Sequence, residues 1–530
     1  MTKTAEPLLP ASPPSFYDRW QTRLATEPRV RRLHAWLVPT VVTLLAAVLR
    51  LWNLGHPREL VFDETYYVKD AWTQWVLGYA ATWPEGANEQ FASGQTDIFG
   101  TDPSFVVHPP LGKFFIGVGM WIFGPESPVG WRIAAALFGT GCVLLLYVLA
   151  KSLTGSIVFA GVASFLLAID GLGIVMSRVS LLDIFLTFFV LLAFWFVVLD
   201  RRRHLDRLAE RLAQRASAGE IPSWGPVLWN RPWVIAAGAA AGAATAVKWS
   251  GLWVLAAIGI YLVVTDMLER FRLGITFWPL DAVRQGAVSF VLLVPVAFGV
   301  YLLSWTGWLA SDGGYDRHAA DDDPATGLLS WVPLSLQSLW RYHQTIYAAM
   351  LNITSEHSYM SPAWQWPLLW RPTSMYAHST TDGQDGCTGG ANGCLEILYS
   401  MPNPLLWFAS MAAALYLFYR FVLDRNWRHA LVLVGLAATW LPWFLYADRT
   451  VFQFYTIVMW PFLLLALTFA LRDLAGRHYR AAEHRLAGQR VVIVFLAVVV
   501  ALSVFWYPLW SAIQVPYDFY RLHNWMTGWV

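Results

Sequence analysis

Charged residues are scarce in this sequence. Only 14% of the 530 residues are Asp, Glu, Lys or Arg, whereas 57% are apolar and the mean hydropathy is +0.45. A soluble globular domain carries about 25% charged residues, so the composition argues against that class. The net charge of +2 is too small to indicate a nucleic-acid partner, and none is expected.

Cysteine is also rare, with three residues in the chain. Cys142 lies inside an apolar run and is predicted to be a small apolar filler. Cys387 and Cys394 flank the sequence TGGANG. If this loop faces an oxidising exterior, the two are expected to form a disulfide. Two cysteines without convincing histidine partners make a poor zinc site.

What the sequence has in abundance is long apolar runs. Many reach or approach the roughly 20 residues that a helix needs to cross the hydrocarbon core of a bilayer. The sequence therefore predicts an all-α polytopic membrane protein with eleven transmembrane helices. These are expected at residues 33–54, 131–150, 155–176, 179–199, 232–248, 251–268, 286–308, 404–423, 429–446, 451–471 and 491–511.

Lysine and arginine predict the orientation of these spans. With the N-terminus inside, most of the 37 Lys and Arg residues fall in the N-terminal tail and in inside loops such as 200–215 and 472–485. An odd number of spans then puts the C-terminus outside. No cleavable signal is recognisable at the N-terminus. The expected organisation is a cytoplasmic tail (1–32), a membrane module (33–308), a large outer loop (309–403), a second membrane module (404–511) and an outer tail (512–530).

Two outer segments are too long to be simple connectors. The first, 55–130, contains the apolar stretches 66–79 and 113–124, which are too short to span and are expected to form interfacial helices. The second, 309–403, is polar and rich in Gly, Asp, Trp and Pro. A loop of this length without obvious helices is usually functional.

Polar and aromatic residues gather on the predicted outer side. Each alone has a simpler explanation, because Lys and Arg at span ends often snorkel and Trp and Tyr anchor helices at the interface. Asp170 and Asp183 are harder to dismiss, since a carboxylate in or beside an apolar helix is costly and usually functional. The residues on this side are Asp63, Glu64, His108, Arg132, Asp170, Arg178, Asp183, Lys248, His357, Tyr359, Ser361, Trp364, Trp366 and Arg449.

This combination favours glycosyl transfer at the membrane surface. A carboxylate such as Asp63 or Glu64 can take the proton of an acceptor hydroxyl. Cationic residues, with Arg132, Arg178, Lys248 and Arg449 as candidates together with Asp183, can form the site of a lipid-bound phosphate and stabilise the charge it gains on leaving. His108, His357, Tyr359, Trp364 and Trp366 are candidates for contacts with the sugar or the acceptor.

Several motifs, in order along nearly the whole chain, resemble those of the protein O-mannosyltransferases of glycosyltransferase family 39. They are FDETYY (62–67), VHPPLGK (107–113), SRVSLLD (177–183), AVKWSGL (246–252), YLLSWTGW (301–308), SPAWQWP (361–367) and the C-terminal FWYPLWSAIQVPYDFYRLHNWM (505–526). The resemblance is closest to bacterial, notably actinobacterial, members. It implies the GT-C fold and inverting transfer of mannose from polyprenyl-phosphate-mannose to Ser or Thr hydroxyls of proteins outside the cytoplasm.

The resemblance also implies roles for individual residues. Asp63 falls on the position regarded as the base, and Glu64 is expected to support the acceptor site, although the order of these two roles stays open. Arg132 and Lys248 lie in matching motifs and become candidates for donor contacts. One departure stands out: the loop 309–403 is too short for the MIR domains that eukaryotic members carry there.

Alternatives remain at this point. Another GT-C transferase could use a different lipid-linked sugar or a glycolipid acceptor, and a transporter would instead favour ionisable residues near the middle of the membrane and paired repeats. Adjacent carboxylates could bind a divalent cation, but Arg and Lys can neutralise one phosphate without it, so no metal is expected. The expected partners are the bilayer of the cell membrane, the lipid-linked donor and acceptor proteins met during Sec-dependent export.

Overall fold

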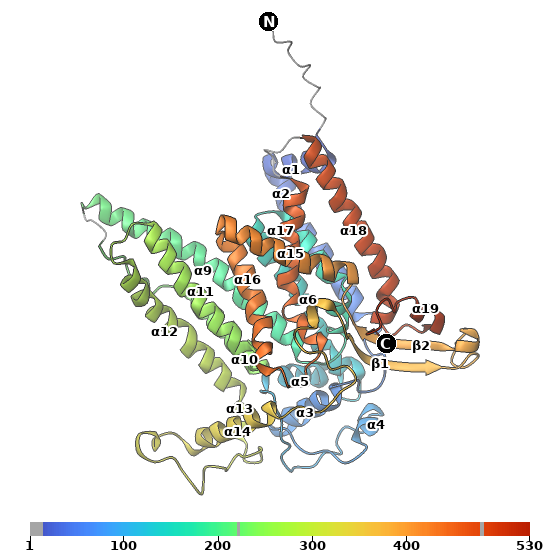
Figure 1. The fold of residues 1–530 in the computed structure, drawn as a ribbon. Coiled ribbons are helices and arrows are strands. Elements are labelled where there is room, and N and C mark those ends of the chain that lie inside the picture. The colour runs from blue at the N-terminus through green and yellow to red at the C-terminus, as the bar shows by residue number, and fades with distance from the viewer. Residues whose placement is uncertain (1–13, 220–222, 477–481, 530) are drawn as a thin grey trace.

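The computed structural model describes residues 14–219, 223–476 and 482–529. Residues 1–13 of the predicted tail, 477–481 of the predicted inside loop and residue 530 of the outer tail lie outside these ranges. Most of the described chain is helical, and long helices run side by side through the body of the molecule (Figure 1). The predicted tail 1–32 already contains a helix, α1 (Phe16–Thr26).

Within the described residues, eight helices are long and apolar enough to cross a membrane. The protein is therefore a multi-pass membrane protein. These helices are α2 (Pro28–Leu51), α6 (Pro128–Thr154), α9 (Asp183–Ser217), α11 (Gly251–Arg272), α12 (Trp278–Ser304), α15 (Pro404–Asp424), α16 (Trp427–Trp440) continued by the 3₁₀ turn η4 (Leu441–Tyr446), and α18 (Ala482–Trp510).

The other three predicted spans coincide with shorter helices. The range 155–176 divides into α7 (Ile157–Ala168) and α8 (Gly171–Val175), because Asp170 accepts a hydrogen bond from the backbone N–H of Gly173 and caps α8. The range 451–471 divides into the 3₁₀ turn η5 (Gln453–Ile457) and α17 (Trp460–Ala475). The number of crossings and the sides of the two termini stay predictions.

Helix α10 (Pro232–Val247) matches the small-residue run at 232–248 and packs closely between α9 and α12. A Cβ atom on Gly238 or Gly242 would meet the backbone of α12 at 2.5 or 2.4 Å. Glycine therefore allows the two helix backbones to approach each other, as small residues do in membrane proteins. This close packing matters for the site, because Lys248 follows the last residue of α10 directly.

The first outer segment folds into α3 (Glu64–Leu77), α4 (Ala87–Ala92) and α5 (Leu111–Phe123). Two of them confirm the helices predicted at 66–79 and 113–124. Helix α3 packs on α5, and α5 packs on α6. The three lie together at one end of the long helices (Figure 1).

The second outer segment differs from the prediction of a loop without obvious helices. It contains α14 (Leu334–Leu351), an 18-residue helix, after the short helix α13 (Thr306–Ala310) and the 3₁₀ turn η1 (Gly327–Leu329). The apolar residues of α14 alternate with Arg341, His343 and Gln344, which hid the helix from a search for apolar runs. It buries Leu339, Tyr342 and Ile346 against Trp305 and Trp308, at the end of α12 and in α13.

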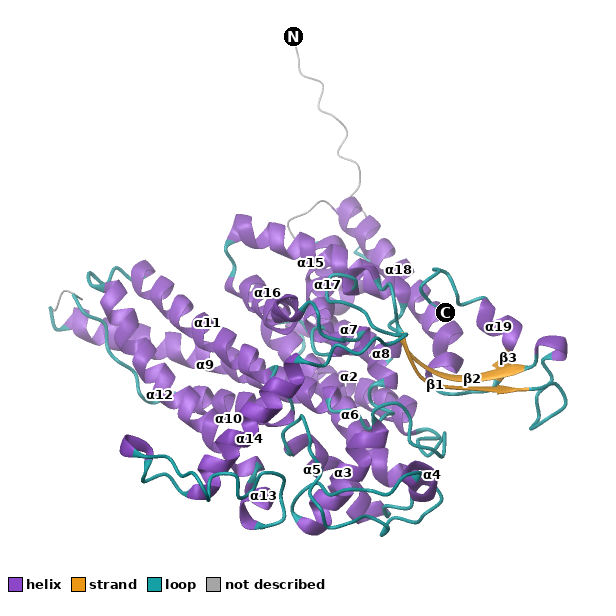
Figure 2. Cartoon of the chain, turned by 60° about the horizontal axis from the view of Figure 1, so that its bottom comes forward, coloured by secondary structure: helices purple, strands orange, loops and turns teal. Residues whose placement is uncertain are grey.

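The prediction of an all-α fold is also wrong in one place. Strands β1 (Thr373–Thr380) and β2 (Cys394–Ser400) form an antiparallel hairpin, and β3 (Val515–Pro516) from the C-terminal tail pairs with β2. A disulfide between Cys387 and Cys394 closes the turn of the hairpin. The three strands lie to one side of the helices, next to α19 (Tyr517–Arg521) (Figure 2). A strand partner this far along the chain is invisible to local sequence patterns.

Candidate functional site

The adjacent carboxylates Asp63 and Glu64 have different environments. Glu64 is fully buried as the first residue of α3, whereas Asp63 is half-buried at the N-cap of that helix. The preceding residue, Phe62, has a φ of 48°, in the left-handed region that bulky residues seldom adopt. The Phe62 ring is held by edge-to-face contacts with His357, Phe452 and Phe454.

Glu64 is fully occupied by partners within the protein. Its two carboxylate oxygens accept hydrogen bonds of 2.8 Å from Nε and a terminal nitrogen of Arg132. The backbone N–H groups of Ser180 and Val61 donate to the same oxygens at 2.8 and 3.0 Å. Both oxygens of Glu64 are therefore occupied, and the residue holds the loop in place. Of the two roles open to the acid pair, base and positioning residue, this geometry favours the positioning role for Glu64.

Arg132 is likewise not available to a donor phosphate. It is fully buried, and its remaining N–H groups donate to the carbonyl oxygens of Leu54, Pro57 and Glu59. The guanidinium thus ties the first outer loop to α6. Every N–H group of the guanidinium is thus used by the loop that leads to Asp63, and none is left for the donor phosphate that the sequence motifs suggested for Arg132.

Arg178 is a second arginine, among the phosphate-site candidates, whose terminal nitrogens have partners inside the protein. It is buried, and its terminal nitrogens donate to the carbonyl oxygens of Arg50, Trp52 and Asn53 at the C-terminal end of α2. A cation at a helix C-terminus satisfies carbonyl groups that have no partner within the helix. Arg178 is therefore a helix cap, a role that depends on a contact across the fold.

The Asp63 carboxylate, unlike that of Glu64, is not filled by hydrogen bonds from the protein, and charged groups lie near it. Burial raises the pKa of the Asp63 carboxyl, Lys248 lowers it, Asp183 raises it and a hydrogen bond from Tyr67 lowers it, and the net pKa is about 6. A carboxylate with a pKa close to the working pH is suited to accept a proton. Tyr67, one helical turn after Asp63, was not singled out from the sequence, although the spacing of four residues on a helix indicates the contact.

Lys248 and Asp183 form a buried ion pair. The Lys248 ammonium lies 2.9 and 2.8 Å from the two oxygens of Asp183, the first residue of α9. The same ammonium lies 4.7 Å from the ring centroid of Tyr455. Asp183 therefore fixes Lys248 rather than meeting an anion itself, since a carboxylate next to a phosphate would repel it.

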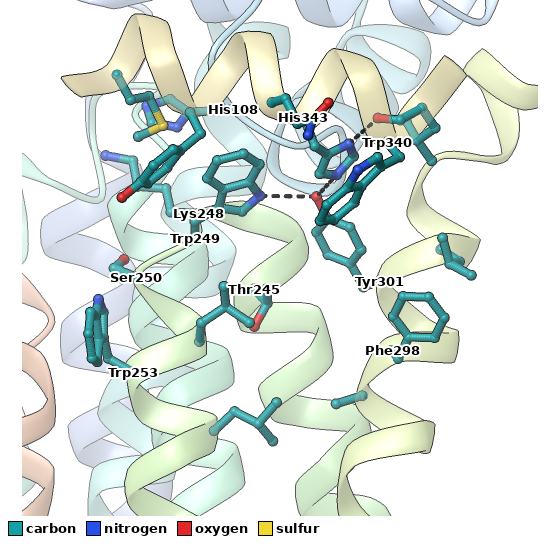
Figure 3. Close-up of a pocket in the computed structure, with 18 of the residues that line it drawn as sticks. His108, Thr245, Lys248, Trp249, Ser250, Trp253, Phe298, Tyr301, Trp340 and His343 are labelled. Atoms are coloured by element: carbon teal, nitrogen blue, oxygen red, sulfur yellow. Dashed lines mark hydrogen bonds between the residues drawn. The ribbon is translucent and has the colours of Figure 1, made fainter. Parts of the chain in front are cut away.

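A large cavity opens beside Lys248. Its volume is about 1570 Å³. Apolar residues of α11, α12 and α14 form most of its wall, while Lys248 and His108 lie close together at one end of the view in Figure 3. Four residues with polar or charged side chains in this part of the wall are His108, Lys248, Arg449 and Tyr455. An elongated apolar ligand with an anionic head fits such a lining.

His108 and Arg449 complete the polar part of the cavity wall. Burial, together with the charges of Lys248, Arg449 and Lys113, holds the pKa of His108 well below its usual range, so the imidazole is neutral at pH 7. Its Nδ1 is buried without a hydrogen-bond partner among the described residues. In the part of the chain that the structure describes, no carboxylate forms an ion pair with Arg449. Its guanidinium lies over the ring of Trp443. Both groups can therefore bind a ligand.

The four residues of the stretch 357–366 that were predicted to contact the sugar or the acceptor do not all lie at one place in the structure. His357 packs edge-to-face on Phe62, the residue before Asp63, and accepts a hydrogen bond from the backbone N–H of Tyr359. Trp364 is 60% exposed. Trp366 is fully buried, and its indole N–H donates to the carbonyl of Ser361. Trp366 is therefore a core residue and not a contact for a sugar.

Metal ligands are not grouped in the described part of the chain: no cluster of three His, Cys, Asp or Glu side chains lies in ligand geometry there. Glu64 is committed to Arg132, so the two adjacent carboxylates do not act as a joint pair of ligands. Independence of the reaction from metal stays a prediction.

Comparison with known proteins gives consistent matches. Residues 40–219 match the model of the family described as dolichyl-phosphate-mannose-protein mannosyltransferase, and residues 335–529 match the C-terminal four-transmembrane region of protein O-mannosyltransferases. A polyprenol-phosphate-mannose–protein mannosyltransferase of Mycolicibacterium smegmatis (strain MKD8) is 32% identical over 94% of this chain and 93% of its own length. The enzyme of that name from Corynebacterium glutamicum is 30% identical over 98% and 96%.

Among solved structures, the Saccharomyces cerevisiae protein O-mannosyltransferase Pmt1-Pmt2 complex bound to the sugar donor superposes with a TM-score of 0.68. The match covers 94% of this chain and 92% of that chain at 15% identity, so it shows a shared fold. This is the GT-C fold that the sequence motifs imply. With both halves of the chain matched by models of one family and relatives similar over nearly its full length, the chain belongs to the protein O-mannosyltransferase family.

Proposed function

We propose that this protein transfers mannose from polyprenyl-phosphate-mannose to Ser or Thr hydroxyls of proteins. The observation that carries the proposal is the closeness of Asp63 to Lys248, whose charge lowers the pKa of Asp63 and whose side chain lines a large, mostly apolar cavity. A base, a phosphate-binding cation and a lipid-sized cavity are thus combined at one place. The mycobacterial and Corynebacterium relatives are named polyprenol-phosphate-mannose–protein mannosyltransferases, which supports the choice of sugar and lipid.

In the proposed reaction, the acceptor oxygen attacks the anomeric carbon while its proton passes to the Asp63 carboxylate. A carbon–oxygen bond forms on one face of the sugar as the bond from the anomeric carbon to the phosphate oxygen breaks on the other. The configuration inverts, and the electron pair of the broken bond stays on the polyprenyl phosphate. With a pKa of about 6, Asp63 is mostly ionised at pH 7 and ready to accept the proton.

The leaving phosphate gains negative charge as the bond breaks. Lys248, Arg449 and the imidazole of His108 are proposed to stabilise that charge, since all three line the cavity. Asp183 keeps the Lys248 ammonium in place. The apolar wall between α11, α12 and α14 is proposed to hold the first part of the prenyl chain. In this proposal the cationic side chains take the role that a divalent metal would otherwise have.

The acceptor is proposed to approach along Phe62, His357 and Tyr359, whose rings contact one another in sequence and are accessible in part. The site is proposed to lie on the extracytoplasmic face of the plasma membrane, as the distribution of Lys and Arg indicates. Acceptor chains would then meet the enzyme as they leave the Sec pathway unfolded.

The test is a transfer assay with purified protein, synthetic polyprenyl-phosphate-[³H]mannose and a Thr-containing peptide. Labelled peptide is expected with the wild-type protein, and Asp63→Asn is expected to lose transfer by at least about 100-fold while still binding the donor. Label in a glycolipid acceptor but not in the peptide would contradict the proposal, and so would full activity of Asp63→Asn.

A further inference from the structure

Helix α14 of the second outer segment forms one wall of the cavity, where His343, Gln344 and Tyr347 contribute side chains. We infer that two adjacent residues of this helix, Tyr342 and His343, are positioning residues that set the phosphate-binding end of the cavity. Tyr342 acts on the segment that carries His108, and His343 acts on the segment that carries Lys248. The inference rests on the proposed function, in which His108 and Lys248 bind the donor phosphate.

The first connection is between Tyr342 and the backbone of Val106. The Tyr342 hydroxyl accepts a hydrogen bond from the Val106 N–H and donates one to the Val106 carbonyl, both at 3.1 Å. Tyr342 is 1% exposed, so water does not compete for these bonds. His108 follows two residues later and is itself followed by two prolines, which restrict the backbone. The position of the imidazole therefore depends on a hydroxyl of α14.

The second connection is a chain of hydrogen bonds with a defined direction. His343 Nδ1 lies 2.6 Å from the carbonyl oxygen of Leu339, which only an N–H can satisfy. Nε2 is then the acceptor for the Tyr301 hydroxyl at 2.5 Å, and the Tyr301 oxygen accepts the indole N–H of Trp249 at 3.0 Å (Figure 3). Trp249 follows Lys248 directly and stacks on the His343 ring, with centroids 5.5 Å apart.

The apolar packing of α14 is enough to hold the helix against α12 and α13, and the polar contacts come in addition to it. The apolar cluster of Trp305, Trp308, Leu339, Tyr342 and Ile346 already holds the helix against α12 and α13. Hydrogen bonds add direction to such packing, because each is satisfied in one geometry only. Both connections end within two residues of a proposed phosphate-binding side chain, on segments far apart in sequence. Helix α14 thereby fixes the separation of His108 and Lys248.

Tyr342→Phe tests the first connection, since it removes the hydroxyl and keeps the ring in its cluster. The KM for polyprenyl-phosphate-mannose is expected to rise about tenfold, as two hydrogen bonds that hold the His108 segment are lost. The KM for the acceptor peptide is expected to change less than about threefold. Tyr315→Phe is the matched control, because its ring contacts Tyr342 but its hydroxyl bonds to none of the described residues.

Tyr301→Phe tests the second connection. It is expected to raise the donor KM about as much as Tyr342→Phe does, because the hydrogen bond that Tyr301 accepts from Trp249 is lost.

A double-mutant cycle separates positioning from simple stabilisation. In the His108→Gln background, Tyr342→Phe is expected to raise the donor KM less than about twofold further, because the group it positions is gone. Partial unfolding would instead lower the amount of active enzyme and leave KM unchanged. A donor KM in Tyr342→Phe equal to that of Tyr315→Phe, or a full tenfold effect in the His108→Gln background, would overturn the inference. Absence of transfer by the wild-type protein would instead refute the proposed function.

Discussion

Glu64 and Arg132 form a fully buried ion pair in which two parallel hydrogen bonds of 2.8 Å join the carboxylate to the guanidinium. The pair connects the first turn of α3 to α6, and the neighbouring Asp63 is left to face Lys248. Two adjacent acids thus have separate tasks: one holds the loop, and the other is available for chemistry.

Glu64→Gln is expected to lower the free energy of unfolding by about 3 kcal/mol, because the Arg132 charge stays buried without its counter-charge. Thermal unfolding in detergent measures the change. Glu59→Gln is the matched control, since Glu59 is an exposed carboxylate of the same loop, and little change is expected there. Equal melting temperatures for Glu64→Gln and wild type would contradict the structural role of the pair.

Transfer is expected to depend on the ionisation of Asp63. Its carboxyl, with a pKa of about 6, must be deprotonated to act as a base, so activity falls as the pH falls. Between pH 7 and pH 5 the ionised fraction drops about tenfold, and kcat/KM is expected to follow. His108 stays neutral throughout this range because its pKa is held well below the usual value. A profile that is flat from pH 5 to 7 would argue against Asp63 as the base.

Tyr67→Phe is expected to shift this profile. The hydrogen bond from Tyr67 lowers the pKa of Asp63, so its removal raises that pKa and moves the midpoint of the activity profile to higher pH. Tyr66→Phe provides the comparison, because Tyr66 is the adjacent tyrosine and is exposed. The same midpoint in both variants would show that Tyr67 does not act on the base.

Lys248→Gln is expected to reduce kcat/KM for the donor by about 100-fold, through loss of a charge-assisted bond to the phosphate. Lys151→Gln, in the last turn of α6 and outside the cavity wall, is the control and is expected to retain activity. Asp183→Asn is expected to resemble Lys248→Gln in kcat/KM, since Asp183 holds the ammonium in place. Wild-type kinetics in Lys248→Gln would exclude this residue from the phosphate site.

Chelation distinguishes the cationic side chains from a divalent metal. Transfer by protein dialysed against EDTA is expected to stay within about twofold of the untreated rate, because Lys248 and Arg449 supply the positive charge at the cavity. Loss of activity that Mg²⁺ restores would show that the reaction requires a metal.

Much of the helical framework was predictable, because a membrane-spanning helix is a continuous apolar stretch of the sequence. Each of the eleven predicted spans coincides with a helix or with two shorter elements. Helix α14 and the strand β3 escaped prediction for opposite reasons. The polar residues of α14 face a cavity that only the fold creates, and β3 is two residues long and is a strand only because β2 lies beside it.

The sequence by itself determined the class of the protein, the region of the site and, through its motifs, the family. Asp63, His108, Lys248 and Arg449 were all identified from it. Only the tertiary structure decided what each charged residue does. Arg132, Arg178 and Lys248 look alike as isolated cations beside apolar runs. In the fold, Arg132 and Arg178 donate to backbone carbonyl oxygens of the first outer loop and of the end of α2, whereas Lys248 pairs with Asp183 and lines the cavity. The partners of a charge come from distant segments, and packing alone brings them together.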